Sequence, residues 1–407
     1  MKTRIKFLYK FFYIINFVLY NLSISKIISF IKILFYSLLK KDTKYPSYLI
    51  KYENNISNLN KKNYTLTFSS GTQAFESLLK SLDIKDKKIG TGSIVFPSIF
   101  GVILRYIDLN NFRLLTCNKD LVIDVNENYE IIKNLDYLVI TFGYGYPYND
   151  SLINKIFEIN NSITLIYDLS HCQGYSEIKN KYSRQVHYFF STQGSKAIST
   201  GEGGIVSTDS HEIYKKMMLN SHINRMDNIL NLSEKEKIAM KIGILSKSRL
   251  SPLGAISGLN DLNLLKKDSK ILREKIAIIY KEFEKIDKVY LPKIYNFNNL
   301  TGFHYGIPFL INPKIPEIQK KETILLIKKY FRVLNYNWLS EDNLRKFIQN
   351  DNFQKFQNYN FDFLQSDQNF EDNEILENLN FIDLNDIKCL PKTIIKIFIK
   401  KIKSLIK

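Results

Sequence analysis

Strand-like and helix-like segments alternate between Tyr64 and Ser170, and this alternation constrains the fold more than any other feature. The run "YTLTF" (64–68) predicts a strand, and Ala74, Leu78 and Leu82 follow it at helical spacing. The later runs "FRLLTC", "YLVITFG" and "ITLIYDLS" are β-branched and apolar, like strands buried in parallel sheets. Because parallel strands need crossover connections, we expect a three-layer α/β domain with a mostly parallel sheet.

The pattern changes from about Leu259. A long charged helix with an apolar stripe is predicted first, then short strand-like pieces, and finally a basic amphipathic helix, "KTIIKIFIKKIKSLIK". These segments predict a smaller α+β domain. We therefore divide the chain into an N-terminal arm (1–45), a large domain (46–262) and a small domain (263–407). The final helix is open to two interpretations, packing on the small domain or contact with a membrane.

The N-terminal arm differs from the rest of the chain. Residues 1–41 are basic and strongly apolar, with no acidic residue. Asn21, Ser25, Ser29 and Lys32 recur at helical steps, which predicts a basic amphipathic helix. Such a helix is typical of a membrane interface. A helical arm packed on the domain or on a partner subunit is an alternative, and so is a spanning or cleaved segment.

The formal net charge of +18 favours anionic partners such as phosphorylated metabolites, acidic lipids or nucleic acid. The lysines are spread along the chain and no nucleic-acid-binding motif is present, so we expect no nucleic-acid partner. The three cysteines, Cys117, Cys172 and Cys389, have no paired or metal-ligand spacing. They indicate reduced thiols in a cytoplasmic protein without a bound metal.

A candidate anion site lies where the first predicted strand passes into a helix. Ser70, Gly71 and Thr72 stand at this junction. The backbone N–H groups at a helix start are unpaired, and the helix dipole favours an anion there. An ordinary helix cap is the alternative, because Ser and Thr are common cap residues.

Four further residues carry candidate chemistry. Asp168 closes an apolar run, so it is expected at the carboxyl end of a sheet strand, where α/β proteins bind ligands. His171 and Gln173 follow and could flank a flat ligand. Lys196 stands between "YFFST" and the glycine-rich "TGEGG". A lysine held in apolar surroundings loses its proton and becomes a nucleophile, although most lysines are solvated surface charges.

The order of these elements resembles the DegT-type sugar aminotransferases, which are pyridoxal-phosphate enzymes of the aspartate-aminotransferase fold. The segments "SSGTQAFESLLKSL", "VFPSIFGVI", "TFGYGYP" and "YDLSHCQG" are similar to family segments. The most specific match is "FFSTQGSKAISTGEGGIVSTD", which resembles the lysine segment of the family. The resemblance covers about Thr65 to Leu259, and the rest only in helix pattern.

This resemblance implies pyridoxal 5′-phosphate as the cofactor and a function for each matching position. Gly71, Thr72 and Ser191 would hold the cofactor phosphate, and Asp168 would bind the pyridinium nitrogen. His171 would lie against the ring. Lys196 would form the Schiff base and then carry a proton between substrate and cofactor carbons. Arg249 and Glu202 are assigned to substrate binding.

Two positions depart from the family pattern. The aromatic residue that stacks on the ring comes four places after the proline, and this position is Gly101 here. Phe100 stands one place earlier, and we assign the ring contact to it. The asparagine that reaches the phosphate of a neighbouring subunit appears as Lys247, which could pair with phosphate as a point charge.

The resemblance implies an aminotransferase that moves an amino group, with glutamate as donor, to a nucleotide-linked keto-sugar for surface glycan (polysaccharide) biosynthesis. We expect a homodimer, either free in the cytoplasm or peripheral at the inner face of the cell membrane, where it would meet an anionic surface. A sugar dehydratase-like enzyme is the first alternative, although the known dehydratase relatives carry histidine in place of the lysine. A catalytically inactive, membrane-associated binding protein on the same fold is the second alternative.

Overall fold

The computed structural model describes residues 27–28, 31–35, 47–146, 148–175, 182, 185–222, 233–241, 247–294, 306–334 and 379–406. Of the N-terminal arm this includes two short helical pieces, residues 27–28 and 31–35, in which Ile27, Ile28 and Ile31 are each about half exposed. The rest of the arm lies outside the described residues, so its membrane interpretation stays a prediction. No helix within the described ranges is long and apolar enough to cross a bilayer.

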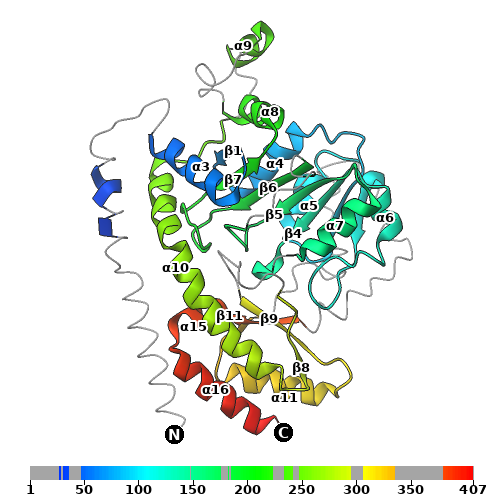
Figure 1. The fold of residues 1–407 in the computed structure, drawn as a ribbon, viewed down its shortest axis with the longest axis vertical. Coiled ribbons are helices and arrows are strands. Elements are labelled where there is room, and N and C mark those ends of the chain that lie inside the picture. The colour runs from blue at the N-terminus through cyan, green and yellow to red at the C-terminus, as the bar shows by residue number, and fades with distance from the viewer. Residues whose placement is uncertain are drawn as a thin grey trace, which may run out of the picture.

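The larger sheet of the described chain has seven strands, in the order β1-β7-β6-β5-β4-β2-β3 (Figure 1). These strands are β1 (Tyr64–Phe68), β2 (Ile89–Gly92), β3 (Phe112–Leu115), β4 (Tyr137–Thr141), β5 (Thr164–Asp168), β6 (Val186–Ser191) and β7 (Gly204–Thr208). Neighbours pair in parallel except at β7, which is antiparallel to both β1 and β6. The expected mostly parallel sheet is confirmed.

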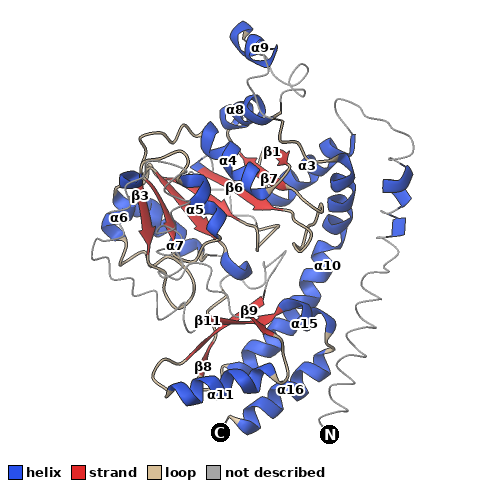
Figure 2. Cartoon of the chain, turned by 180° about the vertical axis from the view of Figure 1, so that it is seen from behind, coloured by secondary structure: helices blue, strands red, loops and turns tan. Residues whose placement is uncertain are grey.

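Helices cover both faces of this sheet, which confirms the three-layer architecture (Figure 2). Leu165 and Tyr167 of β5 point into one buried cluster, and Ile166 between them points into another. The second cluster is formed with α4 (Gly71–Ser81), α5 (Pro97–Ile103) and α8 (His211–Ser221). The first cluster is formed with α3 (Ser47–Asn60), α6 (Tyr129–Lys133), α7 (Asp150–Ile159) and α10 (Pro252–Phe283).

A second, antiparallel sheet lies in the C-terminal part, in the order β10-β11-β9-β8. Its strands and helices are β8 (Val289–Tyr290), β9 (Gly306–Ile311), α11 (Glu317–Lys328), β10 (Val333–Leu334), β11 (Leu379–Asp383), α15 (Leu384–Cys389) and α16 (Lys392–Leu405). This arrangement agrees with the expected smaller α+β part. Helix α10 runs without interruption from the large sheet to this small sheet (Figure 1), so the predicted boundary at residue 262 falls inside a helix. The domain limits stay a prediction.

The C-terminal helix α16 packs on the small domain. Its apolar stripe, Ile395, Phe398, Ile399 and Ile402, is buried against neighbours that include α10. Of the two interpretations of this helix, packing on the small domain therefore accounts for its apolar face.

The topology brings the predicted site residues to one edge of the large sheet. Strands β1, β5 and β6 point in the same direction, because β7 between β1 and β6 is antiparallel to both. Their carboxyl ends carry the turn at Gly71, Asp168 and Ser191. Ligands of open α/β sheets bind at this edge.

Candidate active site

A cavity of about 380 Å³ opens at the carboxyl edge of the large sheet. Seven of the predicted site residues line it: Gly71, Thr72, Asp168, His171, Ser191, Lys196 and Glu202. They come from segments that are far apart in the sequence, and the topology alone brings them together. The cavity also has apolar walls, to which Phe75, Phe96 and Phe189 contribute.

The amino end of α4 forms one side of the cavity and is capped in the expected way. The Ser70 side chain accepts a hydrogen bond from the backbone N–H of Gln73 at 3.1 Å. A Cβ atom on Gly71 would lie 2.7 Å from the Cβ atom of Ser191, so only glycine permits this approach. The helix start, with its unpaired N–H groups, therefore stands directly beside Ser191, and the two can hold an anion together.

A close approach by a second glycine supports the same corner. At Gly204, the first residue of β7, a Cβ atom would lie 2.1 Å from the backbone oxygen of Ser70. Any side chain at position 204 would push the cap residue of α4 away. The glycines of the "GEGG" segment therefore include one that positions the helix start.

Asp168 and Lys196 are the charged pair of the cavity. Burial raises the pKa of Asp168 above its ordinary value, and hydrogen bonding from Ser170 and the charge of Lys196 oppose this rise. Burial lowers the pKa of Lys196 to about 8, although the Asp168 carboxylate acts in the opposite direction. At pH 7 a far larger fraction of Lys196 is thus neutral than of an ordinary lysine, and the neutral amine can attack a carbonyl or accept a proton.

His171 is held by the turn that follows β4. The backbone N–H of Tyr144 donates to Nδ1 of His171 at 3.2 Å. Because Nδ1 accepts this bond, the neutral ring carries its proton on Nε2. Tyr144 lies in the 3-10 helix η2 (Gly143–Gly145) with a φ of 59°, an uncommon conformation for a residue with a side chain. Such outliers are frequent at functional sites.

Gln173 supports the lysine segment and does not line the cavity. Its side-chain amide donates to the backbone oxygens of Ser191 (2.7 Å) and Ile198 (3.2 Å) and accepts from the N–H of Ile198 at 2.5 Å. The sequence allowed Gln173 to flank a flat ligand. The structure instead uses its amide to tie β6 to the segment after Lys196.

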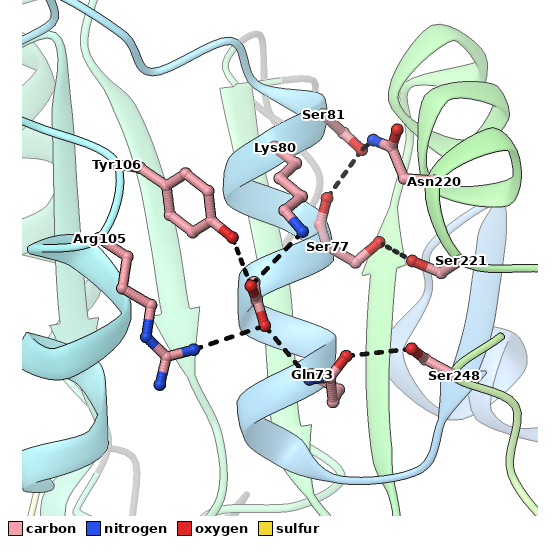
Figure 3. Close-up of polar contacts among 10 residues, drawn as sticks. Gln73, Ser77, Lys80, Ser81, Arg105, Tyr106, Asn220, Ser221 and Ser248 are labelled. Atoms are coloured by element: carbon pink, nitrogen blue, oxygen red, sulfur yellow. Dashed lines mark hydrogen bonds and ion pairs between the residues drawn. The ribbon is translucent and has the colours of Figure 1, made fainter. Parts of the chain in front are cut away.

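Polar contacts on α4 fix this helix to its neighbours (Figure 3). Glu76 accepts hydrogen bonds from Gln73 and Tyr106 and pairs with Lys80 and Arg105. On the other side of the helix, the Gln73 side-chain oxygen accepts from the Ser248 hydroxyl at 3.0 Å. These contacts hold the helix whose amino end borders the cavity.

The remaining predicted residues do not line the cavity. Phe100 is buried in the core, where its ring lies edge-on to Phe112. Lys247 is exposed and Arg249 is half-buried. The structure therefore does not bring these three to the other site residues of the same chain, and their assigned functions stay predictions.

Phe96, Thr141 and Tyr144 are among the residues of the cavity wall that sequence reasoning missed. Phe96 caps the amino end of α5 and is 49% exposed, so its ring is available at the wall. At Gly101, the position where the family pattern has its ring-stacking aromatic residue, a Cβ atom would meet nothing within 4 Å. The available signal for Phe96 was its place directly before Pro97 in the segment "VFPSIFGVI".

The residues present fit the predicted cofactor. The helix start beside Ser191 suits a phosphate, and a buried carboxylate suits a protonated ring nitrogen. The Thr141 hydroxyl oxygen is buried at the wall and has no hydrogen-bond partner among the described residues. A polar group on a ligand would satisfy it. Lys196, with its lowered pKa, suits a covalent link to an aldehyde.

This fold and this cavity together define the architecture of the pyridoxal-phosphate transferases. The chain belongs to the DegT/DnrJ/EryC1/StrS aminotransferase family, whose model matches residues 40–321. The family resemblance read from the sequence is confirmed, and family membership confirms pyridoxal 5′-phosphate as the cofactor.

Three individual relatives each share less than a third of their residues with this chain. An uncharacterized protein of Methanocaldococcus jannaschii is 28% identical over 296 residues, which cover 69% of this chain and 73% of that protein. Among solved structures, the fold is similar to that of E. coli GDP-4-keto-6-deoxy-D-mannose-3-dehydratase with bound hydrated PLP. That match has a TM-score of 0.72 at 17% identity and covers 93% of this chain and 96% of the other.

The sugar aminotransferase CalS13 from Micromonospora echinospora is also similar, with a TM-score of 0.68 at 16% identity. This match covers 92% of this chain and 96% of that chain. Both a dehydratase and an aminotransferase thus share the fold, so the fold alone does not choose between the two reactions.

Proposed function

We propose that this protein is a pyridoxal-phosphate-dependent aminotransferase that transfers an amino group from an amino acid, glutamate, to a nucleotide-linked keto-sugar in surface glycan biosynthesis. The observation that carries this proposal is Lys196 in the cavity with Asp168, with a pKa lowered to about 8. Amino transfer requires a base that accepts a proton from one carbon and returns it to another. Lys196 is suited to this step.

The other residues of the cavity would bind and orient. Gly71, Thr72 and Ser191 would hold the phosphate, and Asp168 would keep the ring nitrogen protonated. The bound cofactor supplies an electron-withdrawing ring. His171, fixed by the Tyr144 N–H, presents an uncharged ring to the cavity. Glu202 at the rim, and Arg249 from its half-buried position, are proposed to contact the substrate.

The dehydratase-like alternative has specific support, because a 4-keto-sugar dehydratase is among the similar structures. The lysine at position 196 weighs against it, since dehydratase relatives are expected to carry histidine there. A catalytically inactive protein is disfavoured because Asp168, Ser191 and Lys196 line one cavity.

The test is the complete reaction. Purified protein loaded with pyridoxal phosphate is supplied with glutamate and a panel of nucleotide-linked 4-keto-6-deoxy sugars, and products are identified by mass spectrometry. An amino sugar formed together with 2-oxoglutarate is the expected result. Loss of a ring hydroxyl without nitrogen incorporation would favour the dehydratase. No product from any sugar, with cofactor bound, would favour the inactive alternative.

A homodimer and a membrane-peripheral location complete the proposal. Lys247 is exposed and does not line the cavity of its own chain, which suits a residue that acts at the site of a neighbouring subunit. The net charge of +18 suits anionic substrates and an anionic lipid surface. Light scattering after gel filtration tests the dimer, and co-sedimentation with anionic vesicles tests the surface contact.

A further inference from the structure

Thr141 is the last residue of β4, and it stands beside Asp168. The two residues are register partners in the parallel pairing of β4 with β5. Side chains of register partners on neighbouring strands leave the sheet on the same side, about 4.8 Å apart. Both line the cavity.

The Thr141 hydroxyl lacks a partner although it is buried. Within the described part of the chain, no group lies within hydrogen-bonding reach of its Oγ1 atom. An orphaned buried hydroxyl is destabilising, and native proteins contain few of them. Its position at the wall of the cavity means that a ligand there can supply the missing partner.

We propose that the Thr141 hydroxyl binds the phenolic oxygen of the cofactor ring. This inference rests on the proposed binding of the ring nitrogen by Asp168. In the pyridoxal ring, the carbon that bears the phenolic oxygen is separated from the nitrogen by one ring atom. The phenolic oxygen and the arm that bears the phosphate lie on opposite sides of the line from the nitrogen through the ring. A ring with its nitrogen at Asp168 of β5 and its phosphate beside Ser191 of β6 therefore turns this oxygen toward β4, the other neighbour of β5. The hydroxyl can then donate a hydrogen bond to the phenolate.

Two probes and one matched control test the proposal. Thr141→Val removes the hydroxyl and keeps the shape. The first probe is pyridoxal 5′-phosphate, and the second is 3-deoxypyridoxal 5′-phosphate, in which hydrogen replaces the phenolic hydroxyl. The control is Thr91→Val, because Thr91 on β2 also has a buried Oγ1 without a partner among the described residues but does not line the cavity.

Dissociation constants are measured by calorimetry on cofactor-free full-length protein. Thr141→Val is expected to raise the constant for pyridoxal phosphate about fivefold to tenfold, the loss of one hydrogen bond, and to leave that for the deoxy probe within about twofold. Thr141→Ser and Thr91→Val should bind as the unmodified protein does. The cofactor-free Thr141→Val protein should unfold at the same temperature or higher, whereas a purely structural function would lower it.

The assignment of Thr141 would be overturned if Thr141→Val bound both probes equally more weakly, or if it bound pyridoxal phosphate as tightly as the unmodified protein does. These outcomes are independent of the proposed reaction. If Thr141→Val weakens the binding of pyridoxal phosphate alone but the unmodified protein transfers no amino group, only the proposed function is overturned. If the protein transfers an amino group but Thr141→Val does not discriminate between the two probes, only the inference on Thr141 is overturned.

Discussion

A Cβ atom on Gly71 would lie 2.7 Å from the Cβ atom of Ser191, so the start of α4 and the end of β6 are in contact only because residue 71 has no side chain. Gly71→Ala should separate the two halves of the proposed phosphate site. We expect the affinity for pyridoxal phosphate to fall about tenfold or more, measured by titration of the cofactor-free protein.

Gly101 provides the matched control for this change. A Cβ atom at Gly101 meets nothing within 4 Å, and the residue lies inside α5. Gly101→Ala should therefore leave cofactor affinity unchanged and stabilise the protein by up to about 1 kcal/mol, because alanine favours the helix. Equal losses of affinity in both variants would show that the close approach at Gly71 has no special importance.

The lowered pKa of Lys196 predicts how cofactor capture depends on pH. Only the neutral amine attacks the aldehyde, and its fraction increases as pH rises through the pKa of about 8. The rate of appearance of the visible band of the bound cofactor should therefore rise between pH 7 and 9 and level off above that, as seen by stopped-flow absorbance. Lys196→Arg should give no such band at any pH. A rate that is still rising at pH 10, without levelling off near pH 9, would indicate an ordinary, solvated lysine.

His187 of β6 predicts a loss of stability in acid. Burial and the nearby charge of Lys62 lower the pKa of His187 to about 3, although Asp209 acts in the opposite direction. In the unfolded chain the His187 side chain binds a proton below about pH 6.5, whereas in the folded chain it binds one only below about pH 3. The free energy of unfolding should thus fall by about 1 kcal/mol per pH unit below 6.5 from this residue alone.

Urea denaturation at pH 7.0, 6.0 and 5.0 measures this effect. His187→Gln cannot titrate in this range and should show a flatter dependence on pH, even if the lost contact with the Thr208 hydroxyl (2.8 Å) lowers its stability at pH 7. The same slope in the variant and the unmodified protein would assign the acid sensitivity to other groups.

The hydrogen bond between Gln73 and Ser248 joins α4 to the segment that carries Lys247 and Arg249. Gln73→Ala and Ser248→Ala should each lower the free energy of unfolding by about 1 kcal/mol. Because both changes remove this bond, the double variant should lose about as much as Gln73→Ala alone, which also removes the bond from Gln73 to Glu76. Additive losses in urea denaturation would mean that the two side chains act independently.

The strongest patterns of the sequence gave the most accurate predictions. "YTLTF" forms β1 at the expected residues, and the apolar run that ends at Asp168 forms β5. Continuous burial of these strands leaves a clear sequence signal. Seven of the predicted site residues meet in one cavity because the order of segments in a parallel fold determines which strand ends become neighbours.

The misses have local physical causes. Strand β7 begins in a glycine cluster that is typical of a turn, and only the close approach to Ser70 explains Gly204. Helix α5 starts at Pro97, which turns Phe100 toward the core and leaves Phe96 at the cavity wall. Which side chains of a helix face the core depends on the residue at which the helix starts. The orphaned hydroxyl of Thr141 is visible only when its surroundings are known.

The central claim is that Lys196 carries out amino transfer, and the half-reaction with glutamate tests it without knowledge of the sugar. Protein loaded with pyridoxal phosphate is mixed with glutamate, and 2-oxoglutarate is quantified alongside the visible absorbance. We expect one equivalent of 2-oxoglutarate per site with loss of the visible band, and none from Lys196→Ala. A loaded protein that keeps its band and releases no 2-oxo acid from glutamate or from any other amino acid would contradict the account.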